Sequence, residues 1–121
     1  MSKPNSKFWK NKNVLITGHT GFKGGWLSVL LNYMGSRIIG YALKPAGKNN
    51  FFNAINVKKI LKKDFRRDIR DLDNLKKVIK NNKPEIIFHL AAQSSVIESF
   101  KNSHTTVTSN VLGTANVLEA I

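Results

Sequence analysis

Apolar residues along the chain gather into short runs that alternate with segments of helical periodicity. Three runs, Asn13–Thr17, Arg37–Leu43 and Glu85–Leu90, are rich in β-branched residues and bounded by glycine or proline, which is typical of buried parallel strands. A more polar strand is expected over Lys63–Arg67, where the polarity favours an edge position. The pattern therefore predicts four strands.

Helical spacing follows the first strand and predicts a helix that ends near Gly35. One face of that helix is expected to pack on the sheet, with Trp26 in the core. The residues that define this face are Phe22, Trp26, Val29, Leu30 and Tyr33.

Two more helices are expected further along. Asp71 is placed to cap the first of them, and the run from Asn81 to Pro84 ends it. Its buried stripe is expected to be Leu72, Leu75, Val78 and Ile79. The second covers roughly Thr105–Ile121, with Val107, Val111, Leu118 and Ile121 near one face. The segment Phe51–Ile60 is ambiguous and is read as a short helix under a surface loop.

Strands that alternate with helices pair in parallel through right-handed crossovers. We therefore expect an α/β fold, a Rossmann-like doubly wound parallel sheet that is incomplete, with about four strands. Residues 13–121 would form the N-terminal part of an NAD(P)-binding Rossmann domain. Residues 1–12 would form an N-terminal basic segment, and a substrate domain would be absent from this chain.

Composition narrows the class of protein. The 121 residues contain no cysteine, which excludes disulfides, thiolate metal sites and cysteine nucleophiles, and no metal site is expected. The N-terminus is polar and the longest apolar stretch is short, so we expect a cytoplasmic protein without a membrane span. The net charge of +13 suggests nucleic-acid binding. The lysines, however, are scattered along the sequence with few aromatic residues between them. We expect no nucleic-acid function.

The strongest chemical signal is a glycine turn between the first strand and the first helix. Gly18 permits a tight turn, Gly21 lets backbone approach a pyrophosphate, and Gly24 lets the helix lie close to the strand. Free amides and the helix dipole at that terminus favour phosphate groups. In a β-α-β context the turn predicts a dinucleotide-binding site.

The spacing Gly-x-x-Gly-x-x-Gly, with Asp68-Ile69, His89–Gln93 and Asn110–Thr114, resembles the extended short-chain dehydrogenase/reductase family. Within that family, the run from Thr17 to Gly24 is similar to the CDP-glucose 4,6-dehydratases. The resemblance covers Phe8 to Ile121. It implies an NAD-dependent lyase of deoxysugar and lipopolysaccharide biosynthesis that acts on a nucleotide sugar, with CDP-glucose as the expected substrate, and that forms a homo-oligomer.

The resemblance also implies a role for each matching residue. Gly18, Gly21 and Gly24 would form the pyrophosphate turn, with Phe22 and Lys23 donating backbone contacts. Asp68 and Ile69 would flank the adenine, and Leu90, Ala91 and Ala92 would line the nicotinamide ribose. Gln93 and Ser94 would face the cleft, Ser94 toward substrate, while Asn110 would support backbone near the catalytic centre. His89 is read as a core histidine with its hydrogen bonds satisfied.

Two features depart from the family pattern. No acidic residue follows the second strand to hold the adenosine ribose, and Lys44 stands there instead, so NADP is the alternative to the favoured NAD. The run Ser94-Ser95-Val96-Ile97 is more similar to the corresponding sequence of dehydratases that act on GDP-mannose or dTDP-glucose. The resemblance therefore does not decide which nucleotide the substrate carries.

No catalytic residue is expected in this chain. The resemblance implies that the family's Tyr-x-x-x-Lys pair lies beyond Ile121. Neither Tyr33 nor Tyr41 is followed by lysine four residues later, so no local pair replaces it. The 121 residues alone are therefore expected to be inactive. The alternatives are a related epimerase or reductase, a non-catalytic cofactor-binding module, or a basic nucleic-acid binder.

Overall fold

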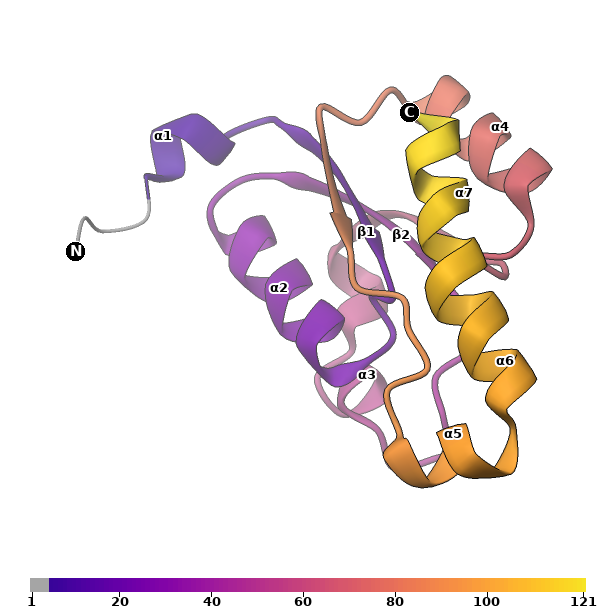
Figure 1. Cartoon of the computed structure of the whole chain (residues 1–121). Coiled ribbons are helices and arrows are strands. Elements are labelled where there is room, and N and C mark those ends of the chain that lie inside the picture. Colours follow the sequence, from indigo (N-terminus) through magenta and orange to yellow (C-terminus); the bar gives the residue numbers. More distant parts are fainter. Residues whose placement is uncertain (1–4) are drawn as a thin grey trace.

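The structure is a computed structural model that describes residues 5–121, so the first four residues of the expected basic segment lie outside it. Its centre is a four-stranded sheet in the order β3-β2-β1-β4, and every strand pair is parallel (Figure 1). The strands are β1 (Asn13–Thr17), β2 (Arg37–Ala42), β3 (Leu61–Arg66) and β4 (Ile86–His89). The Rossmann-like α/β fold is confirmed, and so is the edge position of the polar third strand.

Helices connect the strands and cover both faces of the sheet. Helix α2 lies on one face, and α4 and α7 lie on the other (Figure 1). The helical elements are α1 (Ser6–Trp9), α2 (Phe22–Tyr33), α3 (Phe51–Ala54), the 3₁₀ turn η1 (Val57–Ile60), α4 (Leu72–Asn82), α5 (Val96–Lys101), α6 (Ser103–Val107), the π-helical turn η2 (Thr108–Leu112) and α7 (Gly113–Ala120).

The alternation of side chains along β1 divides the core into two layers. Val14 and Ile16 pack with Leu31 of α2 on one face. Leu15 packs with Leu75 of α4 and with residues of α7 on the other face. Because both faces of β1 are buried, this strand reads as a continuous apolar run.

The strand order places the topological switch point of the sheet between the carboxyl ends of β1 and β4. The chain moves from β1 to β2 to β3 in one direction, then crosses back to put β4 on the other side of β1. Connections that leave two neighbouring strands in opposite directions open a gap between them, which is where doubly wound sheets bind ligands. The glycine turn and the segment after β4 both start at this point.

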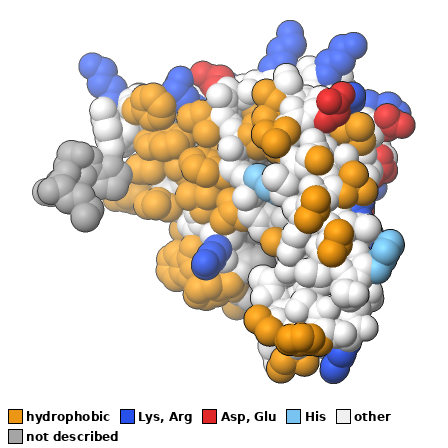
Figure 2. All heavy atoms as spheres, in the orientation of Figure 1, with side chains coloured by type: hydrophobic (Ala, Val, Ile, Leu, Met, Phe, Trp, Pro, Cys, Tyr) orange, Lys and Arg blue, Asp and Glu red, His pale blue; other side chains and the backbone are white. Residues whose placement is uncertain are grey.

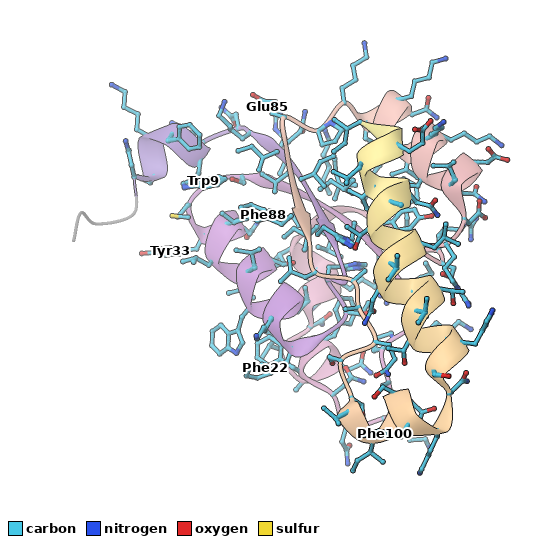
Figure 3. All side chains as sticks on the ribbon, viewed as in Figure 1. Trp9, Phe22, Tyr33, Glu85, Phe88 and Phe100 are labelled. Carbon is cyan, nitrogen blue, oxygen red and sulfur yellow. The ribbon has the colours of Figure 1, made fainter. Side chains whose placement is uncertain are left out.

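The prediction of which face of α2 is buried is wrong. Trp26 is 53% exposed, and Phe22, Leu30 and Tyr33 are exposed as well. Tyr33 points away from the sheet (Figure 3). The buried side of α2 carries small residues instead, because they allow the helix to lie close to the glycine turn, to α3 and to the sheet; its buried members are Gly24, Gly25, Ser28 and Leu31.

The face expected for the last helix also differs. Gly113, Asn116 and Val117 are buried, whereas the apolar residues expected on one face are exposed, namely Val107, Val111, Leu118 and Ile121. Hydrophobic side chains gather on the visible surface over α2 and around α5 (Figure 2). No helix within residues 5–121 has the length and apolarity needed to cross a membrane.

The N-terminal segment contacts the sheet, which its basic composition does not predict. In α1, Trp9 packs against Phe88 of β4, with ring centroids 6.2 Å apart (Figure 3). The Lys12 ammonium lies 2.9 Å from a carboxylate oxygen of Glu85, at the start of β4. The described part of the segment is therefore attached to the domain.

Candidate functional site

The glycine turn joins β1 to α2 at the switch point. Gly18 has φ +77°, in the left-handed region that favours glycine, and its N–H donates to the Tyr41 carbonyl at 2.9 Å. The N–H of Gly21 donates to the Gly18 carbonyl at 3.0 Å and closes the turn. Gly21 is also the N-cap of α2 and has no side chain to cap it, which leaves the first amides of the helix for an anion.

Close contacts at this turn leave room only for hydrogen at two positions. A Cβ atom on Gly24 would collide with the Gly18 carbonyl, and one on Gly18 would lie 2.7 Å from the Ala91 nitrogen. A Cβ atom on Gly21 would meet only the Gly18 oxygen, at 3.4 Å. The turn is thus built by Gly18 and Gly24, while the ligand-approach role of Gly21 stays a prediction.

The segment after β4 lies directly against the turn. The N–H groups of Leu90 and Ala91 donate to Thr17 Oγ1 at 3.1 and 3.2 Å. Ala92 and Ser94 are exposed at the same edge of the sheet. The Thr17 hydroxyl, one residue before the glycine turn, thus holds the segment predicted for the nicotinamide ribose beside the turn predicted for the pyrophosphate.

Asn110 fixes the far end of this segment from within η2. Its Oδ1 accepts from the Gln93 N–H at 2.8 Å, and its Nδ2 donates to the Gln93 carbonyl at 2.9 Å. The Gln93 side chain donates to Thr106 at 2.8 Å and accepts from the Ser95 N–H, so it lies on α6. Both ends of Leu90–Gln93 are thus anchored by hydrogen bonds, while the role of Asn110 at the catalytic centre stays a prediction.

Asp68 lies at the end of β3, where an adenine-binding carboxylate was expected. Arg70 donates to it through Nη2 at 2.6 Å and through its backbone N–H at 2.9 Å. These bonds hold the pKa of the Asp68 carboxyl below its usual value, so the group is ionised at neutral pH. The Ile69 side chain is buried in the core, which leaves only its backbone to face a ligand.

A hollow of about 510 Å³ lies beside Asp68 and is lined mainly by basic side chains. Lys44 follows β2 there, in the position where dehydrogenases that use NAD often carry an acid. Arg66 is already engaged, since it pairs with Asp64 at 2.8 Å and covers the Phe52 ring. The residues around the hollow are Leu43, Lys44, Arg66, Arg67 and Asp68.

A buried histidine, which the sequence analysis did not predict, lies inside the turn. His19 is fully buried, and its Nε2 lies 2.8 Å from an Asp64 oxygen on β3. Burial lowers the pKa of His19 and outweighs the opposing effect of the Asp64 hydrogen bond. Since Asp64 lies 45 positions away in sequence, no local motif could reveal the pair.

His89 has a partner on each ring nitrogen, as expected of a satisfied histidine. Nδ1 lies 2.7 Å from Thr17 Oγ1, and Nε2 lies 3.1 Å from Thr114 Oγ1. The ring is only half-buried, and burial lowers its pKa. Within residues 5–121, no cluster of acidic and histidine side chains has the makeup of a metal site.

Comparisons with known proteins agree with this geometry. A family model described as GDP-mannose 4,6 dehydratase matches residues 15–121. CDP-glucose 4,6-dehydratase from Salmonella typhimurium is 41% identical over 114 residues, covering 94% of this chain and 32% of that protein. UDP-glucose 4-epimerase from Mycolicibacterium smegmatis is 37% identical over 107 residues, covering 88% of this chain and 33% of the relative.

Solved structures show the same fold. UDP-glucose 4-epimerase from Thermotoga maritima, crystallised with UDP-glucose, superimposes with a TM-score of 0.78 at 28% identity, covering 89% of this chain and 33% of that one. The Thermus thermophilus enzyme in complex with NAD gives 0.77 at 31% identity, with 89% and 33% covered. The chain spans about a third of the length of these relatives. It belongs to the GDP-mannose 4,6-dehydratase family of extended short-chain dehydrogenase/reductases.

Proposed function

We propose that this chain is the N-terminal, NAD-binding part of a nucleotide-sugar 4,6-dehydratase, with CDP-glucose as the sugar nucleotide. The observation that carries the proposal is the glycine turn packed against Leu90–Gln93 at the topological switch point. The 41% identity to a CDP-glucose 4,6-dehydratase supports the choice of substrate. The relatives solved with NAD support the choice of cofactor.

In this proposal the chain's own residues bind and orient the cofactor. Amides of Phe22, Lys23 and Gly24 hold the diphosphate, and the Asp68 carboxylate accepts from the adenine amine. Small side chains at Ala91 and Ala92 leave space for the nicotinamide ribose. NAD, when bound, supplies the hydride acceptor. We place the catalytic Tyr-x-x-x-Lys pair in sequence that follows residue 121. We also expect the full-length protein to be a cytoplasmic homo-oligomer. The exposed apolar face of α6 to α7 would contribute to its subunit interface.

Calorimetric titration with NAD and with NADP tests the cofactor assignment directly. We expect saturable binding of NAD by the folded 121-residue chain, with NADP binding more weakly. A tenfold or greater preference for NADP would reassign the cofactor and give Lys44 and Arg67 a 2′-phosphate to hold. An absence of binding at saturating concentrations of both would refute the proposal.

An epimerase is the second candidate, because UDP-glucose 4-epimerases occur among both the sequence relatives and the solved neighbours. The two activities share the cofactor half and differ in their products. A full-length protein that begins with this chain should release a 4-keto-6-deoxy sugar if it is a dehydratase. Formation of the C4 epimer instead would select the second candidate.

A further inference from the structure

Thr17 Oγ1 has three hydrogen-bond partners, and their chemistry determines where its proton lies. The N–H groups of Leu90 and Ala91 can only donate, so they occupy the two lone pairs of the hydroxyl. The remaining contact, 2.7 Å to His89 Nδ1, must therefore use the Thr17 proton. It follows that His89 Nδ1 is an acceptor and carries no proton.

The other side of the ring leads to the same assignment independently. The Thr114 hydroxyl lies 2.6 Å from the Asn110 carbonyl, and since a carbonyl can only accept, Thr114 donates there. A lone pair of Thr114 is then left for His89 Nε2, 3.1 Å away, which must carry the proton. Both ends require a neutral ring protonated on Nε2.

The result is a chain of hydrogen bonds that runs in one direction. It starts at the Thr17 hydroxyl, passes through the His89 ring and the Thr114 hydroxyl, and ends at the Asn110 carbonyl. The Asn110 side chain then holds the backbone of Gln93. The two terminal residues of the chain are thus the ones that grip opposite ends of Leu90–Gln93.

We propose that His89, as the neutral tautomer protonated on Nε2, is a positioning residue that sets Leu90–Gln93 against the glycine turn. Its Nδ1 fixes the direction of the Thr17 proton and so keeps both lone pairs of that hydroxyl toward the two amides. Without this acceptor the hydroxyl rotates and the Ala91 amide loses its partner, whereas the Leu90 amide still donates to the Thr17 carbonyl at 3.1 Å. The consequence for the cofactor rests on the proposed function, because the positioned segment is the one assigned to the nicotinamide ribose.

Nuclear magnetic resonance of protein labelled with ¹⁵N-histidine tests the tautomer. The ring signals of His89 are identified by their loss in His89→Phe. We expect a protonated Nε2 and an unprotonated Nδ1 at pH 7, with or without NAD. A protonated Nδ1, or a charged ring, at that pH would overturn the proposal.

Amide hydrogen exchange tests the positioning in the absence of any ligand. In His89→Phe we expect exchange at the Ala91 amide to rise about fivefold, as for the loss of one net hydrogen bond. His89→Asn keeps an acceptor at the place of Nδ1 and should restore the protection. Equal exchange rates in His89→Phe and the wild type would count against the proposal, even if the variant melts at a lower temperature.

Measuring the affinity for NAD distinguishes a failure of the proposed role of His89 from a failure of the cofactor assignment. We expect His89→Phe to bind NAD about fivefold more weakly than the wild type, and His89→Asn to bind within about twofold of it. A wild-type protein that binds no NAD would refute the proposed function, while tautomer and exchange would still decide the role of His89. Normal NAD affinity in a folded His89→Phe would refute the positioning role alone.

Discussion

His19 lies directly over Gly40, so that the imidazole of the glycine turn rests on the backbone of β2. A Cβ atom added to Gly40 would meet Cγ, Cδ2 and Nε2 of the ring. The ring is held there by Asp64 on β3 and by an edge-on contact with Phe52, with centroids 5.7 Å apart. The conformation of the turn is thus coupled to the strand beneath it.

Gly40→Ala should destabilise the domain by about 1 to 3 kcal/mol, the usual cost of forcing an extra carbon into a packed site. His19→Ala removes the ring that the new methyl group would meet. In that background we expect the same Gly40→Ala change to cost less, which a double-mutant cycle of urea unfolding measures. Strict additivity of the two changes would contradict the contact.

Acid should destabilise the fold before the carboxylates protonate. Burial lowers the pKa of both His19 and His89 from the ordinary value of 6.5. Below that value the unfolded chain binds protons that the folded chain does not, so stability falls as the pH drops through 6.5 and levels off below the folded-state pKa. Urea midpoints measured between pH 7.5 and pH 5 should show this loss.

The double variant His19→Asn, His89→Asn provides the control for the acid effect. It lacks both groups, so its midpoint should change little with pH until the carboxylates begin to protonate. Those with a lowered pKa, namely Asp68, Asp71 and Glu85, lose their stabilising partners only at lower pH. An unchanged pH slope in the double variant would assign the effect to other groups.

Adjacent leucines on α2 test which face of the helix is buried. Leu31 is 2% exposed and packs in the core, whereas Leu30 is 47% exposed. Leu31→Ala should cost about 2 to 5 kcal/mol of unfolding free energy, the range for a buried leucine. Leu30→Ala should cost less than about 1 kcal/mol. Equal costs in thermal or urea unfolding would reject the helix orientation.

The strands and their parallel pairing were predictable because the apolar runs and the helices between them are local features of the sequence, whereas the order of the strands in the sheet was not predicted. β1, β2 and β4 are short apolar runs that end at turn residues, and β3 is polar because it lies at the edge. The face of α2 was not predictable from hydrophobicity. Gly24, Gly25 and Ser28 pack there because small side chains allow close approach, while the larger Trp26 stacks outside on Phe51.

At the candidate site, the sequence identified the backbone elements better than the side-chain partners. The glycine turn and Asn110 belong to local motifs, and each has a contact that agrees with the expected geometry. The partnerships of His19 with Asp64 and of Thr17 with His89 join residues 45 and 72 positions apart. Such pairs depend on the register of neighbouring strands, which no local pattern encodes.

Neighbouring glycines in α2 offer a matched test of the cofactor turn. A methyl group on Gly24 would collide with the backbone carbonyl of Gly18, which cannot move without opening the turn. On Gly25 it would lie 2.8 Å from the ring of Phe51, a half-buried side chain that can shift, and 3.7 Å from Val57 Cγ2. We expect Gly24→Ala to weaken NAD binding at least about tenfold, a loss of about 1.4 kcal/mol, and Gly25→Ala to retain it. Similar affinities for NAD in the two folded variants would show that the glycine turn does not bind the cofactor.

Asn110→Asp separates the two hydrogen bonds that hold Gln93. The aspartate keeps an oxygen for the Gln93 N–H but replaces the donor that faces the Gln93 carbonyl with a second acceptor. The resulting repulsion should lower the unfolding free energy by about 1 to 3 kcal/mol and weaken NAD binding in the same variant. Because protonation of the aspartate restores a donor, both defects should shrink as the pH is lowered toward 4. Calorimetric titration at two pH values distinguishes this from a general loss of packing, which would leave the defect unchanged or larger in acid.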